Sequence, residues 1–275
     1  MGRAMVLPST AILLVLFCVA CKRELDIRLS SEEIAEIKVK KDPLRLHFRE
    51  TADLGQGLRV TKKEFHHFNE KGRTKIDILY PQVLGSGDTR IVKFNQQVKA
   101  LAFQYARYHL NVPPEDARRF RRLTQGDPPD EYPNVDITYS IELVTAEVLS
   151  VAFHQYEYSG GAHPGQSYFT INFDLKRKKV IQLPELFKRD TKYLERMVEY
   201  CNKALLEHTD YAPMGLTAEL KNFTAWHLTK DSFCIDFDRC EFLPCAPGEQ
   251  IVAIPYADLK DLLNLDGVLK SVVSQ

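Results

Sequence analysis

The sequence predicts an α+β fold in which helices pack on antiparallel sheets, arranged as two intimately associated subdomains. Three observations support this class. Several segments alternate apolar and polar residues with the period of two expected of strands, and two long segments repeat apolar residues every three or four positions, as helices do. The strands come in runs with helices between them and lack a regular βαβ rhythm, which argues against a parallel α/β sheet.

The first expected subdomain spans residues 44–133. Alternation over 44–48 predicts one strand, and residues 75–80 predict a second strand that ends at Pro81, because proline has no amide hydrogen for a ladder. A helix is predicted from about Thr89 to Leu110, and a short helix over 115–123. The apolar stripe expected to face the core in the longer helix consists of Ile91, Phe94, Val98, Leu101, Tyr105 and Tyr108.

The second expected subdomain spans residues 134–275. Residues 134–183 predict a β-meander, and a helix with Asp190 as its N-cap follows, with Cys201 on its inward face. A hairpin is expected from 223–229 and 232–237 across Lys230 and Asp231. A last strand over 250–254 and a closing helix beginning at 256–263 complete the prediction.

The N-terminus has the pattern of an exported lipoprotein. Arg3 precedes an apolar stretch over 6–19 that is too short and too interrupted for a membrane span of about 20 residues. Small Ala20 lies directly before Cys21, so we interpret 1–21 as a lipoprotein signal peptide with Cys21 as the acylation site, and the charged segment 22–43 as a tether. The alternatives are an ordinary secreted protein and an anchor that keeps its helix.

Charge and motifs exclude several function classes. The 37 Lys and Arg residues balance 37 Asp and Glu residues, so a nucleic-acid partner is not expected. We find no G-x-S-x-G elbow, P-loop, dinucleotide fingerprint or H-E-x-x-H motif, and therefore predict a protein that is not an enzyme and needs no cofactor or metal. Asp236 and Asp238 share one strand face, which we interpret as a solvent-facing edge.

Four cysteines follow the signal peptide: Cys201, Cys234, Cys240 and Cys245. In an oxidising compartment they allow two disulfides with three connectivities, and a short staple between Cys240 and Cys245 is conceivable. No C-x₂-C pair is present, so disulfides or buried free thiols are favoured over a zinc site.

The segment 156–165 is the candidate ligand contact. Tyr156 and Tyr158 supply amphipathic rings, Gly160 and Gly161 permit a close backbone approach, and His163 adds a polar ring. The simpler interpretation is a tight connection between strands in which His163 caps a carbonyl group.

This segment also carries a resemblance to a known family. The stretches that carry it are 160–164 (GGAHP), 172–174 (NFD), 181–187 (IQLPELF), 242–248 (FLPCAPG), 253–259 (AIPYADL) and 80–83 (YPQV) with Asn95. Together they resemble the extracytoplasmic domain shared by anti-sigma-V-type sensors and the non-catalytic N-terminal part of certain peptidoglycan deacetylases. The resemblance covers roughly residues 44–270.

The resemblance implies a two-part α+β fold and a binding role, since the domain recognises lysozyme-type muramidases in the sensors. Our first hypothesis is a lipid-anchored envelope module that binds a muramidase-like protein or a peptidoglycan fragment through Tyr156, Tyr158 and His163. The alternative is an envelope glycan hydrolase that uses His163 with Glu157 or a strand aspartate. A purely structural lipoprotein is the third hypothesis. Lys22 after Cys21 favours the outer membrane as the destination.

Overall fold

The computed structural model describes residues 51–55, 58–84, 87–123, 133–159 and 163–273, which belong to one compact unit. The predicted signal peptide with Cys21, the tether 22–43 and the strand at 44–48 lie outside the described residues. Among the helices that the structure describes, none has the length and apolar character needed to cross a bilayer.

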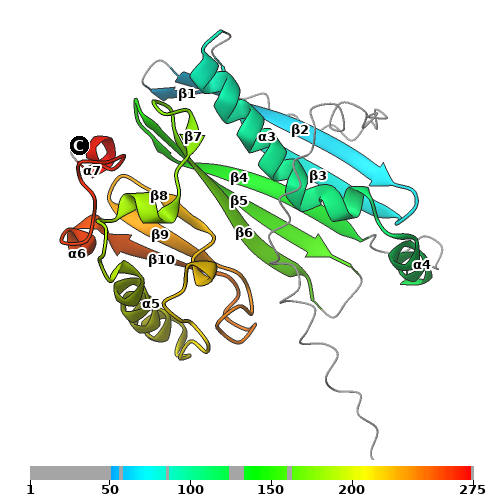
Figure 1. Cartoon of the computed structure of the whole chain (residues 1–275). Helices are drawn as coiled ribbons and strands as arrows, with labels where there is room; N and C mark the ends of the chain where they lie inside the picture. The colour runs from blue at the N-terminus through cyan, green and yellow to red at the C-terminus, as the bar shows by residue number, and fades with distance from the viewer. Residues whose placement is uncertain (1–50, 56–57, 85–86, 124–132, 160–162, 274–275) are drawn as a thin grey trace, which may run out of the picture. The chain divides into compact units, whose positions relative to one another are not determined.

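A seven-stranded sheet, here called the large sheet, forms most of the fold (Figure 1). Its strands lie in sequence order: β1 Thr51–Gly55, β2 Leu58–Asn69, β3 Thr74–Leu84, β4 Asn134–Val144, β5 Val148–Tyr158, β6 Gly165–Asp174 and β7 Lys179–Val180. Strands β4 to β7 are the predicted meander. Every neighbouring pair is antiparallel except β3 and β4.

The parallel pairing of β3 and β4 differs from the expected purely antiparallel sheet. Two parallel neighbours need a long crossover connection, and here it contains helices α3 (Thr89–Leu110) and α4 (Pro114–Leu123). Figure 1 shows α3 lying along one face of the large sheet. We call the opposite face of the large sheet the distal face.

A second sheet of three antiparallel strands has the order β10–β9–β8, with β8 at Trp226–Leu228, β9 at Ser232–Phe237 and β10 at Gln250–Pro255. It packs with helices α5 (Tyr193–Thr209), α6 (Tyr256–Leu259) and α7 (Lys270–Val273), and 3₁₀ turns form at Leu183–Leu186 and Leu220–Asn222. The mixed α+β class predicted from the sequence is confirmed, and so is the hairpin of β8 and β9.

Strand β3 continues through Pro81, which corrects the prediction that this proline ends the strand. Pro81 pairs with Lys62 of β2, whereas the ladder between β3 and β4 stops at Ile78. The strand is therefore paired on only one side at Pro81, and a residue without an amide hydrogen is tolerated there.

Helix α3 has the predicted bounds, and Asp88 caps it by accepting a hydrogen bond from the Arg90 amide. Its buried face differs from the predicted stripe at the C-terminal end. Tyr105 and Tyr108 are 39% and 44% exposed, and the buried side chains are Ile91, Phe94, Val98, Ala102, Phe103, Ala106 and His109. The predicted residues follow a seven-residue repeat, which drifts by about 20° per repeat from the buried face of a straight helix, and this helix has 22 residues.

Helix α5 begins at Tyr193, three residues after the expected N-cap. Asp190 has φ of 59°, a left-handed conformation that does not fit an N-cap residue, and Lys192 takes that position without a side-chain hydrogen bond. Cys201 points inward as predicted. The closing helix is also shorter than expected, because α6 ends at Leu259.

Polar side chains from the large sheet bind the free edge of β8. Ser150 Oγ accepts the Leu228 amide at 3.0 Å, and Thr170 Oγ1 accepts the Trp226 amide at 3.1 Å. Asn172 Nδ2 donates to the Trp226 carbonyl at 2.7 Å. These contacts give hydrogen-bond partners to amide and carbonyl groups that an edge strand otherwise leaves without one. They therefore hold the three-stranded sheet against the large one.

The expected boundary between residues 133 and 134 stays a prediction. The ladder between β3 and β4 joins residues 75–78 to residues 134–137, so a single sheet runs across that position.

Candidate functional site

The predicted ligand segment lies at the end of β5. Tyr156 and Tyr158 are half-buried residues of that strand, while Gly160 and Gly161 lie outside the described residues. His163 is exposed, and its Nδ1 lies 3.2 Å from the carbonyl oxygen of Pro164. This is the carbonyl contact that the simpler interpretation of the segment expects.

Tyr156 belongs to a row of polar side chains that crosses five strands of the large sheet. The register pairs neighbouring members of this row in the order His66, Asp77, Asp136, Tyr156 and Gln166, one from each of β2 to β6. Residues directly opposite one another in a ladder project from the same face. The row lies on the distal face, because Phe65 and Phe169, which contact α3, alternate with its members.

Hydrogen bonds link the β2 and β3 end of this row. His66 Nδ1 lies 2.5 Å from Asp77 Oδ1, and His66 Nε2 lies 3.4 Å from Glu64 Oε2. Burial lowers the pKa of His66, but the hydrogen bonds from its ring to Asp77 and Glu64 outweigh burial and raise that pKa. The imidazole is therefore held in one orientation, and its protonated form is favoured.

Asp77 and Asp136 place two carboxyl groups side by side on parallel strands. Burial raises the pKa of Asp136, and the nearby Asp77 charge raises it further. A hydrogen bond of 2.5 Å from Asn134 Nδ2 to Asp136 Oδ2 acts in the opposite direction. A carboxyl pair of this kind retains a proton more readily than an isolated carboxylate and can both donate and accept hydrogen bonds.

Tyrosine rings lie next to these carboxyl groups. Tyr156 pairs with Asp136, and Tyr158 pairs with Asn134, two residues further along the same face. In the adjacent row, the His154 ring lies 5.3 Å from the Tyr168 ring, and Glu249 already contacts His154, with 3.0 Å between Oε1 and Nε2. Rings with a polar edge beside fixed donors and acceptors form a surface suited to a polar ligand with apolar patches, such as a sugar.

Glu157 projects from the other face of the sheet. It contacts His109 of α3, with 3.3 Å between His109 Nε2 and Glu157 Oε2, and His109 is buried. In the described part of the chain, the polar contact of His163 is with the Pro164 carbonyl and not with a carboxylate. The structure therefore does not bring together the acid–base group that the hydrolase hypothesis requires.

Asp236 and Asp238 correct the sequence interpretation of a solvent-facing edge. Asp236 is only 3% exposed, and its Oδ2 lies 2.9 Å from Nδ1 of buried His227. Asp238 Oδ1 accepts a hydrogen bond from the Tyr168 amide at 2.7 Å. Asp236 is thus a structural contact within the three-stranded sheet, and Asp238 is one between the two sheets.

The cysteines are divided between a disulfide and two free thiols. Cys240 and Cys245 form a disulfide with a Cα–Cα distance of 4.4 Å, while Cys201 and Cys234 are buried and free. Burial raises the pKa of the Cys201 thiol to about 12, which makes it a poor nucleophile. Across the described ranges, no three His, Cys, Asp or Glu side chains are grouped to hold a metal ion.

Sequence reasoning missed His66, Asp77 and Asp136 as site residues. A signal was present, because Ile76-Asp77-Ile78 and Val135-Asp136-Ile137 repeat the pattern of one aspartate between two β-branched residues. Each pattern predicts an aspartate on the polar face of a strand. The pattern does not reveal that the two strands are parallel neighbours in register.

Comparison with known proteins assigns relatives to two segments. Residues 69–166 match the family described as Deacetylase PdaC, and residues 184–257 match the family described as a protein of unknown function, DUF3298. The chain is 25% identical over 160 residues to peptidoglycan-N-acetylmuramic acid deacetylase PdaC of Bacillus subtilis strain 168. That match covers 54% of this chain and 34% of the relative, so the chain spans about a third of the relative's length.

Two solved structures share the fold. One is a DUF3298 family protein from Bacteroides fragilis NCTC 9343, with a TM-score of 0.57 and 17% identity over 80% of this chain and 98% of that one. The other is a DUF3298 family protein from Pseudomonas aeruginosa PAO1, with a TM-score of 0.53 and 14% identity over 75% and 94%. The resemblance stated from the sequence is confirmed by these matches.

Proposed function

Because this chain combines a PdaC-like segment with a DUF3298 segment, we propose that it is a non-enzymatic binding module of the cell envelope whose distal face binds a peptidoglycan fragment. The proposal draws on the name of the relative, a peptidoglycan deacetylase. The matched residues 69–166 include Asp77, Asp136, Tyr156 and Gln166, four of the five members of the row.

The observation that carries the proposal is the alignment of His66, Asp77, Asp136 and Tyr156 across neighbouring strands. A glycan offers hydroxyl and amide groups along its edge and apolar C–H groups on its ring faces. The row offers hydrogen-bonding groups of both kinds, with tyrosine rings at one end. The strands hold these groups rigidly, which lowers the entropy lost on binding.

Titration of the purified protein with soluble disaccharide–peptide fragments of peptidoglycan, followed by calorimetry, tests this function. We expect Tyr156→Ala and Asp136→Asn each to weaken binding about tenfold or more, which corresponds to a loss of about 1.4 kcal/mol. The matched control is Tyr211→Ala, which removes an exposed tyrosine outside the large sheet. Equal affinity of Tyr156→Ala, Asp136→Asn and the unaltered protein would exclude the distal face.

A muramidase-like protein is the other partner implied by the sequence resemblance, and two further variants test it. Capture of lysozyme is measured with the unaltered protein, with Tyr158→Ala and with His163→Ala. Capture that both substitutions leave unchanged excludes Tyr158 and His163 from contact with such a partner. Binding of lysozyme without binding of glycan fragments would contradict the glycan proposal.

We also propose that the protein is anchored to an envelope membrane through a lipid on Cys21, with the outer membrane as its destination. This rests on the apolar stretch before Cys21 and on Lys22 after it. Multiple acyl chains hold a protein firmly on a bilayer, since each buried CH₂ group contributes about 0.8 kcal/mol. An anchored module of this kind would meet peptidoglycan directly.

A further inference from the structure

Strand β3 loses its neighbour on one side before it ends. The ladder with β4 stops at Ile78, and five residues later the side chain of Asn95, on α3, hydrogen-bonds to the backbone of Val83. Its Oδ1 accepts the Val83 amide at 2.9 Å, and its Nδ2 donates to the Val83 carbonyl at 2.8 Å. Asn95 therefore bonds to β3 as a neighbouring strand would, and leaves an unpaired stretch of strand between Ile78 and Val83.

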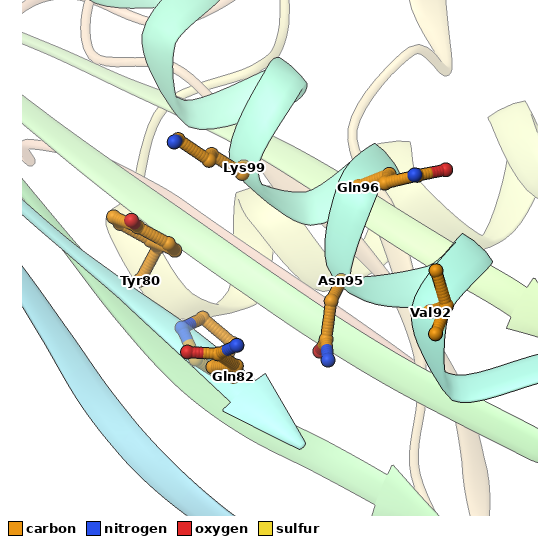
Figure 2. Close-up of a pocket in the computed structure, with 7 residues that line it drawn as sticks. Tyr80, Gln82, Val92, Asn95, Gln96 and Lys99 are labelled. Carbon is orange, nitrogen blue, oxygen red and sulfur yellow. The ribbon is translucent and has the colours of Figure 1, made fainter. Parts of the chain in front are cut away.

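A pocket of about 330 Å³ lies at this unpaired stretch, between β3 and α3 (Figure 2). Besides Asn95, it is lined by Tyr80, Pro81 and Gln82 of β3 and by Val92, Gln96 and Lys99 of α3. Its size is at the lower end of the range for small-molecule sites. It can therefore take a few residues of a peptide or a molecule of similar size.

The polar groups of this pocket include one cation and several hydrogen-bond donors. Lys99 Nζ lies 5.8 Å from the centre of the Phe103 ring, and within the described residues it forms no ion pair with a carboxylate. The side-chain amides of Gln82 and Gln96 and the phenol of Tyr80 can each donate a hydrogen bond. An anionic group is the complement of this set.

The strand itself supplies an acceptor. The Val83 amide and carbonyl both bond to Asn95, so the backbone of Val83 points away from β2. Backbone direction alternates along a strand, and the carbonyl of Pro81, two residues earlier, points the same way. A ligand that lies along β3 can donate an N–H group to this carbonyl, as an added strand would.

We propose that the pocket between β3 and α3 binds the C-terminal end of a short peptide, with the terminal carboxylate at Lys99 and a peptide N–H at the Pro81 carbonyl. The carboxylate pairs with the lysine ammonium, while the glutamine amides and Val92 line the remainder of the pocket. Both the C-terminus of a protein and the stem peptide of peptidoglycan present this chemistry, the latter with D-residues.

This site is separate from the glycan surface. Tyr80 and Gln82 project from the same face of β3 as Ile78, toward α3, because residues two apart share a face. The row with Asp77 and Tyr156 lies on the distal face. Loss of binding at one site is therefore expected to leave the other intact, and a failure of either proposal can be distinguished from a failure of the other.

The test is an NMR titration of the ¹⁵N-labelled full chain with N-acetyl-alanyl-alanine in its L,L and D,D forms and with the carboxamide of each. We expect at least one free acid to cause saturable shifts at Tyr80, Gln82 and Gln96, and the uncharged carboxamides to bind at least about tenfold more weakly. Saturation by the L,L form alone indicates a protein tail, and by the D,D form alone a stem peptide.

The variant Lys99→Gln keeps a polar side chain of similar length and is expected to weaken binding of the free acid about tenfold. Its matched control is Lys93→Gln, on an exposed position of the same helix. No saturable shift with either acid overturns the proposal, as does equal binding of acid and carboxamide or equal affinity of the two lysine variants. The fold of each variant is checked from its spectrum, since both substitutions are at residues outside the buried face of α3.

Discussion

At the scale of single residues, the clearest energetic feature is the buried pair of His227 and Asp236. Their side chains are 5% and 0% exposed, and Glu142, whose side chain is 27% exposed, lies 3.8 Å from the other ring nitrogen. Removing one member of such a pair leaves an uncompensated charge in the interior. We expect His227→Ala to lower the free energy of unfolding by about 3–5 kcal/mol, measured by urea denaturation.

A double substitution separates this charge effect from the loss of packing. In His227→Leu with Asp236→Leu no unpaired charge remains, so we expect a smaller loss of stability than the sum of the two single changes. Additive losses would show that the two side chains do not interact in the folded protein.

The same pair makes stability depend on pH. Burial lowers the pKa of His227, but hydrogen bonds with Asp236 and Cys234 outweigh burial and raise it to about 10. The unfolded chain loses this proton near pH 6.5, so the stabilisation is complete below that pH and is lost as pH rises toward 10. We expect the free energy of unfolding to fall by up to about 1.4 kcal/mol per pH unit in this window.

Denaturation curves recorded between pH 6 and pH 10 measure this dependence. The variant His227→Gln removes the titrating group and should show a flatter profile over the same window. A profile that this substitution leaves unchanged would assign the pH dependence to other groups.

Residue patterns predicted the components of the site better than their assembly. Tyr156 and Tyr158 were identified from composition and their place beside a glycine-rich turn, and the structure puts them on the distal face. Asp77 and Asp136 each carried a clear strand pattern, but their proximity depends on a parallel register set by a crossover through α3. Asp236 was misinterpreted, because alternation shows which residues share a face and not whether another sheet covers that face.

At the scale of elements, polar side chains determine where β8 lies. Asn172 is buried, donates to the Trp226 carbonyl and accepts the Ser150 hydroxyl at 2.6 Å. We expect Asn172→Ala to cost about 1–3 kcal/mol, since it leaves a buried carbonyl without a donor. Hydrogen exchange should show faster exchange at residues 226–228, while Thr224→Ala, at an exposed position before the strand, should leave exchange unchanged.

Asn95 holds α3 to the end of β3 in a comparable way. The substitution Asn95→Ala removes both hydrogen bonds to Val83, and we expect faster amide exchange at Val83 and a stability loss of about 1–3 kcal/mol. Gln97→Ala, on the exposed side of the helix, is the matched control. Unchanged exchange at Val83 would show that packing, and not the asparagine amide, holds this strand end.

Elements with a clean period were predictable, and so were strands rich in β-branched and aromatic residues. Helix α3 and strand β4 are of the first kind, and β5, which is buried on both faces over 148–153, is of the second. In β2 the buried residues change face, from Val60 to Phe65, and charged residues lie between them, so no period of two emerges. Tertiary contacts on both faces define this strand, and no pattern in the local sequence predicts them.

At the scale of the whole molecule, the envelope location that we propose depends on Cys21. We expect Cys21→Ser to abolish labelling by radioactive palmitate and to move the protein from the membrane fraction to the soluble fraction. Cys18→Ser is the control, because bulky Phe17 precedes Cys18 and makes it a poor acylation site. An unmodified sulfur at position 21 in mass spectrometry of the native protein would refute the anchor.

Helix α3 shields one side of the large sheet and leaves His66, Asp77 and Tyr156 on the reverse. A sugar chain held on the reverse side and a peptide end held beside the helix would thus lie on opposite sides of a single sheet. Neither occupant would obstruct the other. A single copy of this protein could then connect two strands of cell-wall material, or attach a protein to the wall, with no movement of its own.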